Sequence, residues 1–112
     1  MTSFIHDRYA LPMYLTETGT DAAADPEKIA SWVVRYVQQT HLAKKAGADV
    51  RGFFFWSLVD NYEWNHGMAM KFGLYEVGSD VQKTRTARSG VKVYADIIKA
   101  RGVSDALLER YP

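Results

Sequence analysis

Two short apolar runs on either side of one long amphipathic segment constrain the fold of this chain most strongly. The runs cover residues 11–17 and 50–58, and the second contains Phe53, Phe54, Phe55 and Trp56 in succession. Apolar runs that do not alternate with polar residues are typical of strands covered on both faces, as in a parallel sheet. We therefore predict two buried strands of an α/β fold.

The segment between the runs has a strong helix start. Asp25 suits an N-cap, Pro26 the first helical position and Glu27 the first turn. The residues that recur at helical spacing and are expected on the apolar face are Ile29, Trp32, Val33, Tyr36, Val37 and Thr40. These features predict a helix over residues 27–46.

The remaining residues complete a βαβ order with a further helix. Residues 59–88 are predicted as a loop with a short extended piece at 72–77, and its polar part at 78–88 as a solvated turn region. Ser89 is expected to cap a helix over residues 89–101, and Ser104 a last short one. A parallel pair joined by a crossover helix has open edges. The whole chain, residues 1–112, is therefore predicted to be part of one larger parallel sheet or barrel domain.

Composition excludes several classes of function. The chain has 112 residues, 24% of them charged, and a net charge of +1. That balance offers no footprint for nucleic acid or an anionic membrane, and no apolar run approaches the roughly 20 residues that span a bilayer. Cysteine is absent, which fits a reducing compartment, and we expect a cytoplasmic location. Neither metal-ligand spacing nor a glycine-rich phosphate loop is found, so no metal or cofactor is expected.

Acidic residues stand where the two predicted strands end. Glu17 closes the first, and Asp60 and Glu63 follow the second, framed by Trp56 and Trp64. A single carboxylate at a strand end is often only a solvated terminus or a cap. Two strand ends with carboxylates and aromatic planes favour a site that binds and cleaves glycosides.

Several segments resemble motifs of glycoside hydrolase family 1. Tyr14-Leu15-Thr16-Glu17-Thr18-Gly19 is similar to its Y-[IV]-T-E-N-G, and the run from Trp56 to Trp64 to its W-S-L-x-D-N-[FY]-E-W. Shorter matches are Lys71-Phe72-Gly73-Leu74, Arg85-Thr86-Ala87-Arg88-Ser89 and His41-Leu42. The resemblance runs from about Pro12 to Ile98, in order and spacing.

The resemblance implies the last two βα units of a (β/α)8 barrel and the chemistry of a retaining β-glycosidase. Glu17 matches the nucleophile. The positions that match substrate-binding residues are Trp56, Glu63, Trp64 and Phe72. Asp60 and Asn61 match the loop framework, and the Trp56–Ser57 peptide bond is expected to be cis. The Glu63–Trp64 pair points to unphosphorylated β-glycosides, because a carboxylate repels a phosphate dianion.

The chain also departs from the family pattern. It lacks the Asn-Glu-Pro segment that carries the acid/base, and a full barrel takes roughly 250 residues. Thr18 stands where Asn is usual, Lys71 where Arg is usual and Gly78 where Asp is usual. We expect the chain to be inactive alone.

Three hypotheses therefore remain at the level of sequence. The chain is a piece of a β-glycosidase that the N-terminal part of the barrel completes, in the same protein or as a separate chain. Alternatively, it is a sugar-binding module that uses Trp56, Glu63 and Trp64, or a βα fragment that covers its sheet edges by forming a homo-oligomer. In each case we expect an exposed apolar face where the barrel interior would lie.

Overall fold

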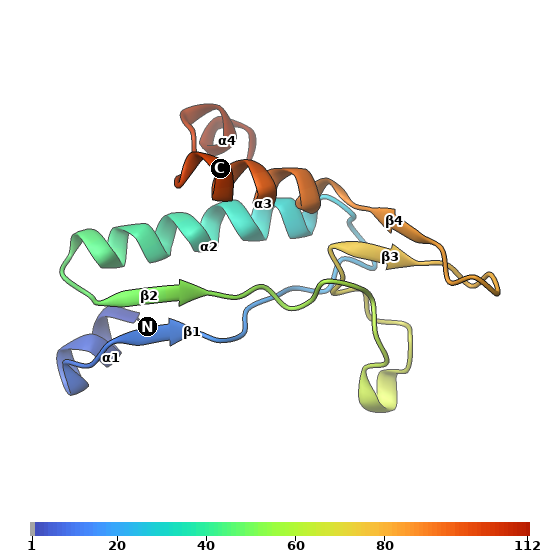
Figure 1. Ribbon diagram of the computed structural model, residues 1–112, viewed down its shortest axis with the longest axis horizontal. Coiled ribbons are helices and arrows are strands. Elements are labelled where there is room, and N and C mark those ends of the chain that lie inside the picture. Colours follow the sequence, from blue (N-terminus) through green and yellow to red (C-terminus); the bar gives the residue numbers. More distant parts are fainter. Residues whose placement is uncertain (1) are drawn as a thin grey trace.

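A computed structural model describes residues 2–112, with side chains from residue 4 onward. Four helices, one 3-10 turn and two separate strand pairs make up the described chain. Helices α2, α3 and α4 lie on one side of the β1–β2 pair, and α1 lies beside the start of β1 (Figure 1). The opposite face of the strand pair carries none of these three helices.

Strands β1 (Met13–Leu15) and β2 (Val50–Phe53) are parallel, as predicted, but shorter than expected. The regular ladder ends at Leu15 and Phe53, and only isolated backbone hydrogen bonds join the two segments beyond these residues. Phe54 N donates to Leu15 O at 2.9 Å, and Trp56 N donates to Thr18 O at 2.7 Å. The predicted strands 11–17 and 50–58 therefore run side by side, but only their first parts form a regular ladder.

Helix α2 (Lys28–Lys45) confirms the helix predicted over 27–46. The predicted start is wrong by two residues: Glu27, not Asp25, is the N-cap residue, and Pro26 lies in the turn before the helix. Asp25 Oδ1 accepts from Glu27 N at 3.0 Å and so caps that turn. The predicted apolar face is only partly right: Val34 is fully buried, while Tyr36 is exposed. The buried face runs through Ile29, Ala30, Val33 and Val34 because α3 packs there, which helical spacing alone does not show.

Helix α3 (Ser89–Ala100) agrees with the predicted helix 89–101, but Ser89 does not cap it. Arg88 is the N-cap residue, and the buried Ser89 hydroxyl has no hydrogen-bond partner among the described residues. Helix α4 (Asp105–Arg110) begins as predicted, because Ser104 Oγ accepts from Leu107 N at 3.4 Å. Helix α4 then folds back on α2, where Tyr111 Oη donates to Glu27 Oε2 at 3.0 Å.

Two segments differ from the sequence prediction. Residues 2–9 show no clear hydrophobic period in the sequence, yet they form helix α1 (Thr2–Tyr9). The predicted loop 59–88 contains the 3-10 turn η1 (Trp64–His66) and an antiparallel hairpin of β3 (Tyr75–Val77) and β4 (Arg85–Ala87). Strand β3 lies within the extended piece predicted at 72–77, whereas η1 and β4 were not predicted. Every residue of β4 is exposed, so no hydrophobic alternation marked it.

The aromatic run of the second strand divides between two faces. Phe53 and Phe55 lie near the ring of Tyr94 on α3, with centroid separations of 6.3 and 6.5 Å. The large apolar residues that remain exposed in the two strand segments are Leu11, Tyr14, Phe54, Trp56 and Leu58. One face of the strand pair is therefore packed on helices, and the other carries the exposed apolar face that the sequence predicted.

Gly52 is required by a side chain rather than by a neighbouring backbone. A glycine inside a strand often marks a site where another backbone approaches closely. In the structure a Cβ on Gly52 would lie 2.5 Å from Cδ1 of Tyr14 on the paired strand. The ring of Tyr14 therefore lies across β2 on the exposed face.

Candidate active site

Glu17 lies just beyond the C-terminal end of β1, in the turn that leaves the strand. Its side chain is exposed. Strands β1 and β2 point the same way, so the segments that follow them meet at one end of the pair (Figure 1). This is the end at which α/β folds place their reactive groups.

Backbone contacts join the turn after Glu17 to Trp56. Thr18 O accepts from Trp56 N at 2.7 Å. A Cβ at position 19 would overlap the carbonyl oxygen of Trp56, so only glycine fits there. The structure therefore brings Glu17 and Trp56 together through the two residues that follow Glu17.

Trp56 also contacts Glu63. Trp56 Nε1 donates to Glu63 Oε1 at 3.3 Å, and Glu63 is half-buried. The Trp56–Ser57 peptide bond is cis, as the resemblance implied. Ser57 N donates to Phe72 O at 3.0 Å, so the backbone of Phe72 lies next to this peptide bond. Glu17, Trp56, Glu63 and Phe72 thus belong to one connected region.

Trp64 contacts the other candidate site residues less than the sequence predicted, because it is largely exposed. Its side chain is 86% exposed, and Tyr62 is 73% exposed. The segment around η1 projects away from the helices (Figure 1). Within residues 4–112, no described hydrogen bond or ring contact ties Trp64 to the other candidate residues.

A buried ion pair supports the loop that carries Glu63. Asp60 is 4% exposed and receives two bonds of 2.9 Å from the guanidinium of Arg88 and one of 2.9 Å from Gly73 N. Arg88 also donates to Gly73 O at 2.6 Å, and Lys71 Nζ lies 3.8 Å from Asp60. Burial alone raises the pKa of Asp60, but these bonds and the charges of Arg88 and Lys71 outweigh it and hold that pKa below its usual value.

The sequence analysis missed the role of Arg88. Residues 78–88 were predicted to be solvated, yet the Arg88 side chain is only 9% exposed. Its partner lies 28 positions earlier in the chain, so local composition could not reveal the pair. Asn61 Nδ2 donates to Ser57 Oγ at 3.1 Å, so Asp60 and Asn61 both brace the loop.

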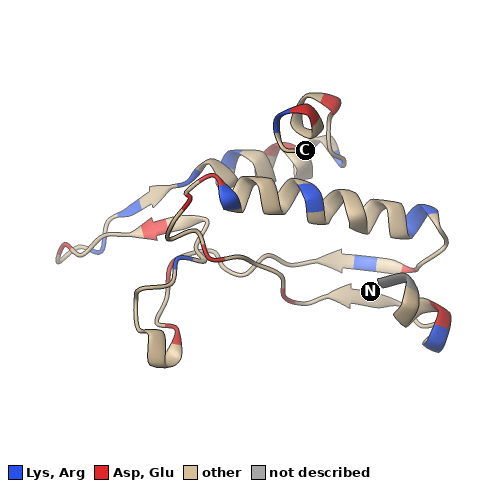
Figure 2. Ribbon diagram, turned by 180° about the vertical axis from the view of Figure 1, so that it is seen from behind, with Lys and Arg blue, Asp and Glu red and all other residues tan. Residues whose placement is uncertain are grey.

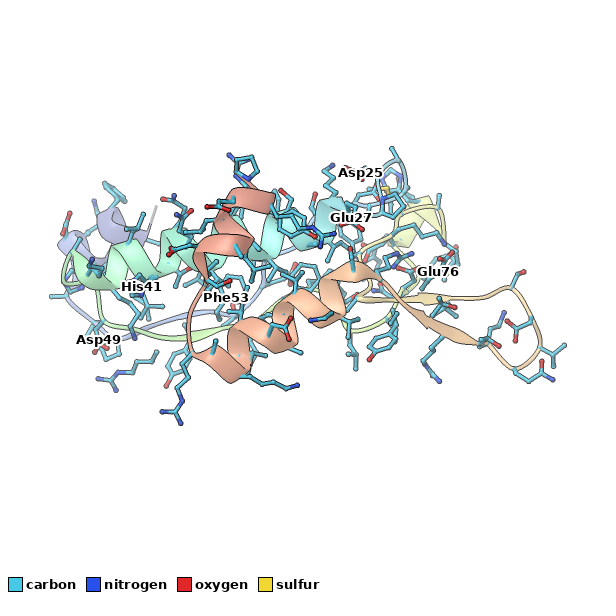
Figure 3. The ribbon with its side chains drawn as sticks, turned by 90° about the horizontal axis from the view of Figure 1, so that it is seen from above. Asp25, Glu27, His41, Asp49, Phe53 and Glu76 are labelled. Carbon is cyan, nitrogen blue, oxygen red and sulfur yellow. The ribbon has the colours of Figure 1, made fainter. Side chains whose placement is uncertain are left out.

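A cavity of about 570 Å³ lies apart from this region. It is lined by the C-terminal halves of α2 and α3, by α4 and by Phe53, and it contains no carboxylate. His41, which borders it, and Asp49 lie toward one end of the molecule, whereas Asp25, Glu27 and Glu76 lie beyond its middle, on the side of the β3–β4 hairpin (Figure 3). Its lining is mainly apolar and suits packing rather than glycoside chemistry.

Charges are scattered rather than gathered on one face (Figure 2). In the described part of the chain, no three acidic or histidine side chains lie close enough together to hold a metal ion. Across residues 2–112, no helix is both long enough and apolar enough to cross a membrane.

The family model described as glycosyl hydrolase family 1 matches residues 1–103. The chain belongs to this family. It is 39% identical over 108 residues to a β-galactosidase of Sulfolobus acidocaldarius, covering 95% of this chain and 22% of that protein. It is also similar to the structure of a β-glycosidase from Pyrococcus horikoshii, with a TM-score of 0.87 and 39% identity over 97% of this chain and 25% of that one.

A third match gives the same answer. The structure described as a β-glucosidase mutant derived from a hyperthermophilic tetrameric structure matches with a TM-score of 0.91 and 35% identity, covering 99% of this chain and 23% of the other. The predicted fold class is confirmed: the chain corresponds to a C-terminal part of the (β/α)8 barrel of this family. It spans only about a fifth to a quarter of the length of these relatives.

Proposed function

We propose that this family 1 chain supplies the nucleophile and the sugar-binding wall of a retaining β-glycosidase. The observation that carries the proposal is the contact of the Glu17 turn with Trp56, which in turn bonds to Glu63. One carboxylate can attack the sugar, and a second carboxylate beside an aromatic ring can bind its hydroxyl groups. The relatives named β-galactosidase and β-glycosidase support the same class of substrate.

In the proposed reaction Glu17 attacks the anomeric carbon. The bond from its carboxylate oxygen to that carbon forms while the bond to the leaving oxygen breaks, and an acid group protonates that oxygen. Water, deprotonated by the same group, then releases the sugar and restores Glu17. A retaining site needs its two carboxyl groups about 5 to 5.5 Å apart.

The acid/base is assigned to the rest of the barrel. Glu63 is unsuited to that role, because the matching motif places it on the sugar-binding side and its carboxylate accepts from Trp56 Nε1. Trp56, Glu63, Trp64 and Phe72 are proposed to line the sugar site. A carboxylate at Glu63 disfavours a phosphorylated sugar, so we propose unphosphorylated β-glycosides as substrates.

A chimera tests the proposal. This chain replaces the matching 108-residue stretch of the Sulfolobus acidocaldarius β-galactosidase, and hydrolysis of aryl β-galactosides and β-glucosides is measured. We expect turnover by the chimera and none by the isolated chain. Glu17→Gln should remove nearly all turnover, whereas Glu109→Gln, on the exposed surface of α4, should leave it unchanged.

Added azide sharpens the test. In Glu17→Ala it should restore cleavage and yield a glycosyl azide of the opposite anomeric configuration, because azide replaces the missing nucleophile. Near-normal turnover by Glu17→Gln, or a preference for 6-phosphoglycosides, would contradict the proposal. Sugar binding by the isolated chain, with no turnover by the chimera, would favour the binding-module hypothesis.

A further inference from the structure

Thr18, which follows Glu17, is bonded on two sides. Its carbonyl oxygen accepts from Trp56 N at 2.7 Å. Its hydroxyl oxygen accepts from Trp32 Nε1, on helix α2, at 3.1 Å. Thr18 therefore joins the turn after β1 both to the segment after β2 and to the helix layer.

Trp32 is a well-fixed anchor for this bond. Its indole stacks on the ring of Tyr36, with centroids 4.0 Å apart and planes 18° from parallel. Trp32 lies on α2 between Ile29 and Val33, both fully buried in the core. Because α2 is packed against the core and the indole is stacked on Tyr36, the position of the Trp32 N–H is restricted.

Glu17 lies beyond the regular hydrogen bonding of β1. The β1 ladder ends at Leu15, and Glu17 is exposed. The carbonyl bond to Trp56 fixes one side of residue 18, and the hydroxyl bond to Trp32 fixes the other. Glu17 shares a peptide bond with Thr18, so the two hydrogen bonds together limit where the Glu17 carboxylate can lie.

We propose that Thr18 is a positioning residue for Glu17, with Trp32 as its anchor. The inference rests on the proposed role of Glu17 as the nucleophile. Thr18 does not contact the sugar in this proposal; it acts through the geometry of the neighbouring residue. Attack on the anomeric carbon depends steeply on that geometry, because a misplacement of about 1 Å can reduce a rate about 100-fold.

Isosteric substitutions in the chimera test the inference. Thr18→Val keeps the shape of the side chain and removes the acceptor, while Thr18→Ser keeps the hydroxyl. Trp32→Phe is not isosteric: it removes the N–H of the other partner together with one ring of the indole. We expect Thr18→Val and Trp32→Phe to lower kcat about 10-fold with KM within about 2-fold, since the sugar-binding residues are untouched. Thr18→Ser should retain most of the parent kcat.

A spectroscopic readout identifies the bond itself. The chain has three tryptophans, so its indole N–H groups give three NMR signals. In the 112-residue chain, Thr18→Val should shift the Trp32 signal and speed its exchange with water, while Thr18→Ser should not. Trp32→Phe assigns that signal by removing it.

The outcomes separate this inference from the proposed function. If Glu17→Gln is inactive but Thr18→Val has the parent kcat, the positioning role is wrong and the nucleophile assignment stands. An unchanged Trp32 signal in Thr18→Val also overturns the inference. If Glu17→Gln keeps its turnover, the proposed function itself fails. Equal losses of kcat in Thr18→Val and Thr18→Ser would show that the hydroxyl is not what matters.

Discussion

Asp60 is the single residue on which the loop after β2 depends most. Its buried carboxylate accepts three hydrogen bonds, two from Arg88 and one from Gly73 N. Arg88 is the N-cap residue of α3, so the ion pair ties that loop to the start of the helix. A buried pair adds little relative to apolar residues of similar volume, but removing one partner leaves an uncompensated charge.

We therefore predict that Asp60→Asn lowers the free energy of unfolding by about 3 to 5 kcal/mol at pH 7, as measured by urea denaturation. Asp96→Asn is the control, because Asp96 forms only an exposed pair with Lys92 and its loss should cost less than about 1 kcal/mol. Similar losses in the two variants would contradict the prediction.

The same carboxylate gives a pH dependence of known sign. Because folding lowers the pKa of Asp60, its ionised form contributes stability above the unfolded value of about 3.9. That contribution falls as the pH drops from there through the lower folded pKa. The difference in unfolding free energy between the parent and Asp60→Asn should therefore shrink below about pH 4, when both are measured in the same buffers. If the difference in unfolding free energy between the parent and Asp60→Asn instead grew as the pH fell below about 4, the prediction would be wrong.

At the scale of elements, α3 shows how the core selects one side of a helix. Helical spacing alone is compatible with an apolar face that includes both Ile97 and Ile98. The structure buries Ile97 with 5% exposure, beside the buried face of α2, and leaves Ile98 60% exposed. Adjacent helical residues point about 100° apart, so packing against one neighbour cannot cover both.

These two isoleucines provide a matched pair of variants. Ile97→Ala should destabilise the chain by about 2 to 5 kcal/mol, because it leaves a cavity in the core. Ile98→Ala should cost less than about 1 kcal/mol, because little of its surface is removed from water. Thermal or urea unfolding of both variants measures the difference. Equal costs would show that the packing of α3 on α2 is not as described.

At the scale of the whole molecule, the strand pair is covered on one face only. Tyr14 and Phe54, both exposed, lie together beside Gly52 on the uncovered side. Leu11, Trp56 and Leu58 are further exposed apolar residues of the two strand segments. In the family barrel this side faces the interior and the remaining strands continue the sheet from its edges. The chain thus exposes an apolar surface of the kind that marks an interaction site.

We predict that the isolated chain sediments as an oligomer at micromolar concentration. Replacing Tyr14 and Phe54 with serine should shift it toward the monomer, because these residues lie on the open face. Val81→Ser, at the 93% exposed tip of the β3–β4 hairpin, should have no such effect. A compact, stable monomer of the parent chain would contradict this prediction and the proposal that the rest of the barrel completes it.

Much of the fold could be read from local patterns. Continuous apolar runs marked the two parallel strands, and the Asp25-Pro26-Glu27 start with its periodic residues marked α2. The position of Glu17 at a strand end and its short motif marked the candidate nucleophile. These features depend on neighbours within a few positions, and such neighbours set backbone geometry and the period of side chains.

Other features were decided only by the tertiary structure. Because α3 packs on α2, Val34 is buried and Tyr36 is exposed. Residues 85–87 form strand β4 because they pair with β3, although all of them are exposed. Arg88 reaches Asp60 across 28 positions, and Trp32 reaches Thr18 across 14. Local sequence determined the two parallel strands, helix α2 and the place of the candidate nucleophile Glu17 just after β1. Contacts between distant segments determined which side chains brace the loops around that residue, because burial and hydrogen bonding depend on which segments the fold brings together.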